Sequence, residues 1–268
     1  MADRAFAGDE FSAVRWHANL PEWWEEHWID AVDDVVEFLR PEGIEVSGSE
    51  LLDLGCGDGI ISLGLLRRAR AARVVGCDLF EVDQAFLTEK CIEHGEPPIS
   101  GTEDLSFVVS RPTGLPFEDA SFDVVTAWSV FEHVLDPRPL LREVVRVLRP
   151  EGVAFLQIWP LWNSEHGSHL WTWFDDPFQH LLLSKEEVRA HLEERIPEED
   201  LASAMFDLYG SCNRISIDEL QMAVVDAGLF LCKVEVGSST FHVPRELQRT
   251  PLSKLAPAGI KIMAKRLN

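Results

Sequence analysis

The chain has 268 residues, of which 46% are hydrophobic, and its formal net charge is −22. This length suits one α/β domain with insertions, or two domains at most. Because nucleic acids and anionic membranes repel such a charge, DNA, RNA and membrane surfaces are disfavoured as partners, and the charge itself mainly indicates a well-solvated surface.

The cysteines indicate a reducing compartment. There are five, they are widely spaced, and no Cys-x-x-Cys pair occurs, so the pattern is that of neither a disulfide framework nor a zinc finger. The first residues include acidic side chains and lack the apolar run of a signal peptide, and no stretch reaches the about eighteen apolar residues of a membrane span. We therefore expect a cytoplasmic protein, either a monomer or a homodimer.

The predicted elements begin with an amphipathic helix over residues 15–40. Its apolar side chains recur at the i, i+3, i+4 spacing of one helix face. They are Trp24, Trp28, Ala31, Val32, Val35, Phe38 and Leu39. A loop follows, so residues 1–47 are predicted to form an N-terminal helical cap.

From residue 50 onward, short apolar runs alternate with amphipathic helices. The predicted strands are 50–55, 73–79, 105–110, 121–130 and 152–160, and the helices between them are 59–69, 81–95 and 137–150. This alternation predicts βαβ units, and therefore a parallel sheet with helices on both faces.

The alternation stops after Pro160 and returns near residue 216. The intervening insertion, residues 160–215, contains a predicted helix at 184–196. A helix at 216–228 and strands at 229–237 and 259–267 follow. We therefore predict one domain over residues 48–268 that is interrupted by this insertion.

The first predicted strand runs directly into Asp-Leu-Gly-Cys-Gly-Asp-Gly, residues 53–59. Its glycines permit a tight turn and close approach of a ligand to the backbone, and the following helix directs its N-terminal amides to the same place. Ile60 stands where a dinucleotide-binding loop has its third glycine. Asp53 suits a cationic amino-acid end better than a pyrophosphate, so a nicotinamide cofactor is disfavoured. Asp78 ends the second strand, where a carboxylate can accept hydrogen bonds from two ribose hydroxyls.

These motifs resemble the class I S-adenosylmethionine-dependent methyltransferases, in particular the type 11 small-molecule group. The matching segments are 51–59, the acid in Val-Val-Gly-Cys-Asp-Leu, 115–137 and 140–156. The resemblance is close over about residues 50–160 and rests on pattern alone over 215–268. It implies a Rossmann-like, seven-stranded, mostly parallel sheet with helices on both faces and an antiparallel last strand. It also implies S-adenosylmethionine as the cofactor.

The resemblance assigns cofactor contacts to the strand ends. The loop would hold the cofactor, Asp78 would bind the ribose, and Leu79 would lie against the adenine. Arg111 stands where an acid often binds the adenine amino group, so Thr113 or a backbone carbonyl would replace it. The implied cofactor-binding residues are Asp53, Gly55, Cys56, Gly57, Gly59, Asp78, Leu79, Thr113, Ala127, Trp128 and Ser129.

Residues 159–180 are unusually rich in aromatic side chains, with four tryptophans, two phenylalanines and three histidines. The segment leaves the end of the fifth predicted strand, on the ligand-binding side of an open sheet, so it can fold back as a lid. Aromatic faces suit a sulfonium cation, and a lid that excludes water favours methyl transfer. The alternative is that the tryptophans only attach the insertion to the domain. The predicted acceptor-binding residues are Trp24, Trp159, Trp162, Trp171, Trp173, His180 and Arg214.

Three histidines, His133, His166 and His169, are predicted as catalytic, because an imidazole can take the proton of a hydroxyl acceptor. A structural role is the alternative for each. A metal site of His166, His169 and His180 with the nearby Asp175 and Asp176 is disfavoured, because the turn lacks the fixed spacing of helix-borne ligands. We therefore expect no metal.

The sequence thus predicts methyl transfer from S-adenosylmethionine to a small-molecule acceptor. Oxygen is favoured as the acceptor atom, possibly on a sugar or glycan precursor, since tryptophan faces suit pyranose rings. The alternatives are N- or C-methylation of another metabolite, and a non-catalytic S-adenosylmethionine-binding partner protein.

Overall fold

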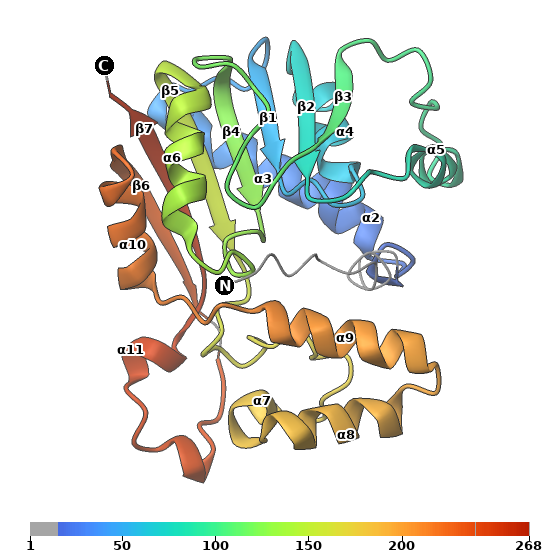
Figure 1. Cartoon of the computed structure of the whole chain (residues 1–268), viewed down its shortest axis with the longest axis vertical. Helices are drawn as coiled ribbons and strands as arrows, with labels where there is room; N and C mark the ends of the chain where they lie inside the picture. Colours follow the sequence, from blue (N-terminus) through green and yellow to red (C-terminus); the bar gives the residue numbers. More distant parts are fainter. Residues whose placement is uncertain (1–15, 239, 268) are drawn as a thin grey trace.

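The structure is a computed structural model that describes residues 16–238 and 240–267. Figure 1 shows two layers: a sheet flanked by helices, and a helical layer below the ends to which most of the strand arrows point. The predicted residues 1–15 of the N-terminal cap lie outside the described part of the chain.

The sheet has seven strands in the order β3-β2-β1-β4-β5-β7-β6. β7 is antiparallel to both of its neighbours, β5 and β6, and the other pairings are parallel. The predicted fold class, including the antiparallel last strand, is therefore confirmed. The strands are β1 (Glu50–Leu54), β2 (Arg73–Asp78), β3 (Leu105–Val109), β4 (Phe122–Trp128), β5 (Leu148–Ile158), β6 (Leu229–Ser238) and β7 (Pro257–Arg266).

Helices cover both faces of the sheet, and each face has its own hydrophobic core. α6 (Pro137–Val147) and α10 (Ile217–Asp226) pack on one face. α3 (Ala31–Leu39) and α4 (Ile60–Arg67) pack on the other, and α5 (Gln84–Glu93) packs beside α4. This double cover explains why β1, β2, β4 and β5 are apolar runs rather than alternating ones. β5 begins at residue 148, earlier than predicted, because the preceding helix ends at Val147.

The predicted N-terminal helix is interrupted: residues 16 and 17 are helical, and the helix resumes only at Trp23. A turn at 18–22, which contains Pro21, precedes α2 (Trp23–Glu25). Proline has no backbone N–H and interrupts a helix at this point. A π-helical turn, Glu26–Asp30, joins α2 to α3, and a 3₁₀ turn, Arg40–Glu42, ends the run. The predicted apolar face from Trp24 to Leu39 is buried, as expected.

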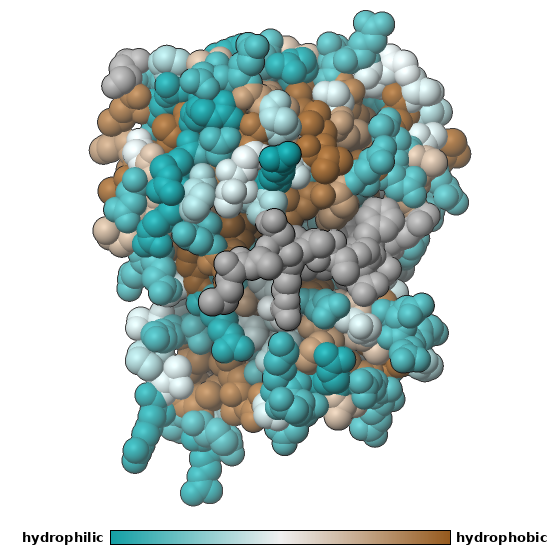
Figure 2. Space-filling model, in the orientation of Figure 1, coloured by the Kyte–Doolittle hydropathy of each residue, from teal (hydrophilic) through white to brown (hydrophobic). Residues whose placement is uncertain are grey.

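The insertion forms a small helical layer with its own core. It contains α7 (Gln179–Leu182), α8 (Lys185–Arg195) and α9 (Glu199–Ser211). α8 begins with a capping box between Ser184 and Glu187, which matches the predicted start. The loop between β6 and β7 adds η3 (Arg245–Leu247) and α11 (Leu252–Leu255) beside it (Figure 1). On the face shown in Figure 2, this lower layer carries many hydrophilic residues together with a hydrophobic patch at its lower left.

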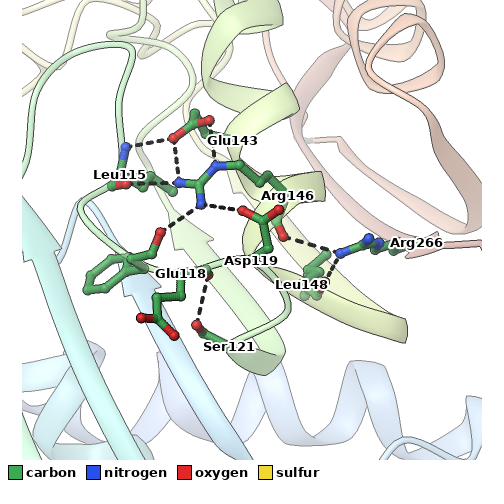
Figure 3. A network of polar contacts seen from close by, with 9 residues as sticks. Leu115, Glu118, Asp119, Ser121, Glu143, Arg146, Leu148 and Arg266 are labelled. Carbon is green, nitrogen blue, oxygen red and sulfur yellow. Dashed lines mark hydrogen bonds and ion pairs between the residues drawn. The ribbon is translucent and has the colours of Figure 1, made fainter.

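Arg146, in the last turn of α6, explains two of the family-like sequence blocks (Figure 3). Its guanidinium donates to the carbonyls of Leu115 and Phe117, and to the carboxylates of Asp119 and Glu143. The arginine therefore fixes the segment before β4 onto α6. The Leu-Pro-Phe block and the block around Arg146 thus belong to one structural unit.

Candidate active site

The glycine loop has the backbone that its sequence predicts. Gly55, Gly57 and Gly59 have φ angles of +71°, +54° and +84°, a region that only glycine adopts readily. A Cβ on Gly55 would lie 2.3 Å from the Cγ2 atom of Val130. The loop is therefore packed against the segment that follows β4.

Asp78 ties the end of β2 to this loop. Its Oδ2 accepts a 2.8 Å hydrogen bond from the Gly57 amide, and its Oδ1 accepts one of 2.6 Å from the Leu79 amide. Burial raises the pKa of Asp78, and the backbone donors oppose this rise. Each carboxylate oxygen has a second lone pair, so the group can also accept from a ribose.

Asp53 lies beneath the loop and is only 1% exposed. Its oxygens accept hydrogen bonds from Ser62 of α4, at 2.6 Å, and from Thr126 of β4, at 3.1 Å. Burial raises the pKa of Asp53 to about 6. Its carboxylate thus joins β1, α4 and β4, and the predicted contact with the cofactor's ammonium group stays a prediction.

The other predicted cofactor residues differ in their surroundings. Cys56 is buried, and burial holds the pKa of its thiol well above the usual range, so it acts as a small space-filling residue. Trp128 stacks on Phe155 in the core. Ser129 has a φ of +52° and donates to Gln157 Oε1 at 3.0 Å. Thr113 is exposed in a turn closed by Arg111 and Gly114.

The N-terminal cap contacts the loop through a pair of residues that the sequence reasoning missed. The indole N–H of Trp23 donates to Asp58 Oδ2 at 2.7 Å, and Asp58 Oδ1 accepts from the Ile60 amide at 3.0 Å. An aspartate two residues before a helix is the available signal. Trp24, predicted at the acceptor site, instead packs with Trp28 in a core shared with α4 and α5.

Glu132, His133 and His169 come together although they are distant in sequence. Their nearest ligand atoms, one from each residue, all lie within 4.8 Å of one another, and the two imidazole rings are 5.0 Å apart. Glu132 and His133 follow β4, whereas His169 belongs to the insertion. Of the predicted catalytic residues, the structure thus places His133 and His169 together. His166 is not one of the three residues of this cluster. The centre of its ring lies 6.1 Å from that of Trp171.

The environment of this cluster keeps its members uncharged. Burial raises the pKa of Glu132 to about 8 and lowers the pKa of His133 to about 4. Burial, together with the neighbouring His133, also lowers the pKa of His169 well below its usual value. At neutral pH both imidazoles therefore carry a free nitrogen lone pair. The predicted general-base role stays a prediction.

The predicted tryptophan wall divides into exposed and buried members. Trp159 and Trp171 are 42% and 37% exposed, and their rings are 5.4 Å apart. Trp162 is buried, and the guanidinium of Arg214 lies 4.5 Å from its ring centre. Trp173 packs within the insertion core beside Trp16. Trp159 and Trp171 are therefore the pair most available to a ligand.

Two more of the predicted residues have structural partners. His180 is buried, and its Nε2 lies 2.8 Å from the carbonyl oxygen of Trp162. Asp175 pairs with Arg195. Neither belongs to the cluster of potential metal ligands in the described residues.

Asn213 connects the insertion to the segment that carries Glu132. Its amide nitrogen donates to the carbonyls of Phe131 and Val134, each at 2.6 Å, and its backbone N–H donates to Glu132 O at 2.7 Å. A small enclosed space of about 10 Å³ is lined by Glu132, Trp162, Cys212, Asn213 and Arg214. Asn213 thus sets the position of the cluster relative to the sheet.

The comparisons with known proteins agree with this geometry. Residues 52–156 match the family model described as a methyltransferase domain. A ubiquinone biosynthesis O-methyltransferase of Neisseria meningitidis is 29% identical over 160 residues, which are 58% of this chain and 64% of that protein. A demethylmenaquinone methyltransferase of Clavibacter sepedonicus is 37% identical over 107 residues, which are 40% of each chain. The chain thus spans less than two thirds of the length of these relatives.

The solved structures show the same fold. An S-adenosylmethionine-dependent methyltransferase from Mesorhizobium loti aligns with a TM-score of 0.53 at 18% identity, over 93% of this chain and 100% of that one. No helix in the described residues is long and apolar enough to cross a bilayer.

The fold is that of the class I methyltransferases, with a glycine loop after β1 and an acid at the end of β2. Residues 52–156 match the methyltransferase domain family, and the predicted resemblance is confirmed. The cofactor of this class is S-adenosylmethionine, as the sequence predicted.

Proposed function

We propose that this protein transfers a methyl group from S-adenosylmethionine to a hydroxyl of a small, ring-bearing molecule. The observation that carries the proposal is the position of the Glu132–His133–His169 cluster. It directly follows the strand whose end faces the glycine loop, and Val130 of the same segment touches Gly55. The cofactor and acceptor ends are therefore neighbours.

The cofactor end holds the donor. The glycine loop permits close approach of the nucleoside, and Asp78 accepts from the ribose hydroxyls. The methionine end then extends toward Ser129 and the cluster. This arrangement supports an in-line approach of acceptor oxygen to methyl carbon, which is the main requirement of methyl transfer.

The acceptor end suits a ring that carries a hydroxyl. Trp159 and Trp171 offer exposed aromatic faces near His169, whose ring lies 6.1 Å from that of Trp171. In this proposal His133 and His169 orient the hydroxyl, and His166 lies beside Trp171. The printed names of the relatives from Neisseria and Clavibacter point to methylation of small molecules. A sugar or glycan-precursor hydroxyl is the narrower form of the proposal, and the tryptophan pair is its support.

The insertion acts as the lid of this pocket in our proposal. It lies below the carboxyl ends of the parallel strands (Figure 1), and it supplies His169 and Trp171. Its closure over a bound cofactor would exclude water from the sulfonium. We also propose a cytoplasmic monomer or homodimer, supported by five free cysteines in the described residues.

The test is formation of S-adenosylhomocysteine in the presence of a panel of catechols, phenols, sugars and amines. Turnover with a hydroxyl compound, and its loss on changing His169 to glutamine, would support O-methylation at this site. Turnover with amines alone would replace it by N-methylation. Binding of S-adenosylmethionine without turnover on any member of the panel would favour a non-catalytic binding protein.

A further inference from the structure

Glu132 has an unusual environment for a buried acid. It is 4% exposed, and no hydrogen bond of normal geometry reaches either carboxyl oxygen from the described residues. Ser129 and the backbone of Trp159 lie near enough to lower its pKa, but the opposing effect of burial is larger. Nε2 of His169, in the same cluster, is also buried without a partner there. Buried polar groups are nearly always paired, because an unpaired one costs a few kcal/mol, and a carboxylate costs more. Such groups therefore indicate that something else binds to them.

The tautomer of His133 can be assigned from its neighbours. Its Nδ1 lies 2.7 Å from Ser211 Oγ, and this hydroxyl donates its own hydrogen to the carbonyl of Leu208, also at 2.7 Å. Ser211 can therefore only accept from His133, so Nδ1 carries the hydrogen and Nε2 has the free lone pair. Metal-binding histidines are oriented in this way, by a hydrogen bond from the nitrogen that does not bind the metal.

The three side chains together offer a carboxylate and two imidazole nitrogens. This set matches the two-histidine, one-carboxylate ligands of catalytic zinc sites, which leave one position open for water or substrate. Magnesium and calcium prefer all-oxygen sites, so the two imidazoles favour a first-row transition metal. The segments that carry the ligands are held in place independently, because Asn213 fixes the backbone around Glu132.

We infer that Glu132, His133 and His169 form a site for a divalent transition-metal cation, zinc being the best match, and that the acceptor oxygen takes its open position. The sequence analysis expected no metal because it considered only the histidines of the insertion. The ligand set instead combines the Glu-His pair after β4 with a single histidine of the insertion.

The catalytic part of this inference rests on the proposed methyl transfer. The acceptor hydroxyl binds to the cation and releases its proton to water. The resulting oxyanion attacks the methyl carbon, the new C–O bond forms as the C–S bond breaks, and neutral S-adenosylhomocysteine leaves. One hydroxyl and one sulfonium thus give one ether, one thioether and one proton. The cation lowers the pKa of the bound hydroxyl, so the histidines act as ligands rather than as free bases.

The direct test is cation binding by the full chain after treatment with a chelator. Zn²⁺ is titrated in competition with a chromogenic indicator, and Co²⁺ binding is followed by its visible absorption. We expect one cation per chain, and affinity at least about ten-fold weaker in Glu132→Gln, His133→Gln and His169→Gln. The matched control is His94→Gln, whose ring stacks on Trp24 in the N-terminal core, and it should bind as the wild type does.

Thermal melts separate lost binding from lost folding. Zn²⁺ should raise the melting temperature of the wild type and leave that of Glu132→Gln unchanged. Without metal, Glu132→Gln should melt at or above the wild-type temperature, because the unpartnered carboxyl is gone. Absence of stoichiometric binding by the wild type, or equal binding by Glu132→Gln and His169→Gln, would overturn the site.

Activity is read separately from binding. Loss of methyl transfer on chelation and its recovery with Zn²⁺ would support the catalytic role, and full transfer by metal-free protein would overturn it. Stoichiometric cation binding without transfer to any acceptor would confirm the metal site while the proposed function failed. The two proposals can therefore fail independently.

Discussion

At the scale of single residues, the feature that stands out is a group of acids at one edge of the sheet. Asp53 and Glu132 are buried there and Asp78 is partly buried, and desolvation raises the pKa of each. In a chain of net charge −22, acids could easily be left in solvent. Strongly perturbed carboxyls that gather in one place are typical of functional sites.

Asp53 gives a prediction for stability. The pKa of Asp53 is about 6 in the fold and about 3.9 in an unfolded chain. The contribution of the protonated carboxyl to the free energy of unfolding is therefore present below about pH 4, and it is lost as the pH rises through 6. Asp53→Asn removes this loss, and asparagine can still accept from Ser62. We expect Asp53→Asn to exceed the wild type in free energy of unfolding by up to about 3 kcal/mol at pH 8.

Denaturant titrations at pH 4 and pH 8 check this. The gain at pH 8 should shrink to near zero at pH 4. A difference that is the same at both pH values would show that the ionisation of Asp53 does not limit stability.

Sequence patterns predicted the strand–loop–helix geometry of residues 53–59 well, because each of these residues is determined by local geometry. The three glycines are needed for their φ angles, and Asp78 for its place at the end of β2. Patterns could not predict that Glu132 would face His169, since the two lie on different segments that only the folded insertion brings together. Likewise, Trp24 fits an aromatic pocket and a helix core equally well by sequence, and the fold places it in the core.

At the scale of elements, the site depends on how the glycine loop packs against the segment after β4. Gly55 leaves no room for a side chain, because a Cβ would lie 2.3 Å from Val130 Cγ2. Val130 is two residues before Glu132. A larger side chain at Gly55 is therefore expected to displace the segment that carries Glu132 as well as the glycine loop.

The alternation of strands and helices predicted the sheet and its cover, because hydrophobic periodicity reports burial directly. It did not predict the π-helical turn or the break in the N-terminal helix at residues 18–22. Both depend on Pro21 and on the packing of tryptophans against α4 and α5, which periodicity does not record.

Gly55→Ala tests the packing of the two segments. We expect a loss of about 2–4 kcal/mol in free energy of unfolding, from the left-handed backbone and the clash together, and weaker S-adenosylhomocysteine binding. Gly43→Ala is the matched control, because Gly43 has a φ of +77° and no atom within 4 Å of its Cβ position. It should lose only about 1 kcal/mol.

A second substitution distinguishes the clash from the backbone effect. Val130→Ala in the Gly55→Ala background should recover part of the lost stability, measured by denaturant unfolding. If it recovers none, the contact between the loop and the segment after β4 is not what limits the substitution.

At the scale of the whole molecule, charge selects the kind of acceptor. A surface with net charge −22 repels phosphate backbones, whose binding relies on clustered lysine and arginine. We expect labelled single- and double-stranded oligonucleotides to show no saturable binding in fluorescence anisotropy, even at low salt. Saturable binding that weakens as salt is added would identify a nucleic acid as partner and contradict the small-molecule assignment.

The central claim is that this fold binds S-adenosylmethionine through the glycine loop and Asp78. Calorimetric titration of S-adenosylmethionine and S-adenosylhomocysteine into the wild type, Asp78→Asn and Asp218→Asn tests it most directly. Asp218 is an exposed carboxylate in the first turn of α10, and serves as the control.

We predict one binding site in the wild type and in Asp218→Asn, and affinity at least about ten-fold weaker in Asp78→Asn, because an amide replaces the acceptor for the ribose hydroxyls. Equal affinity in Asp78→Asn and the wild type, or no binding of either compound by the wild type, would contradict the account.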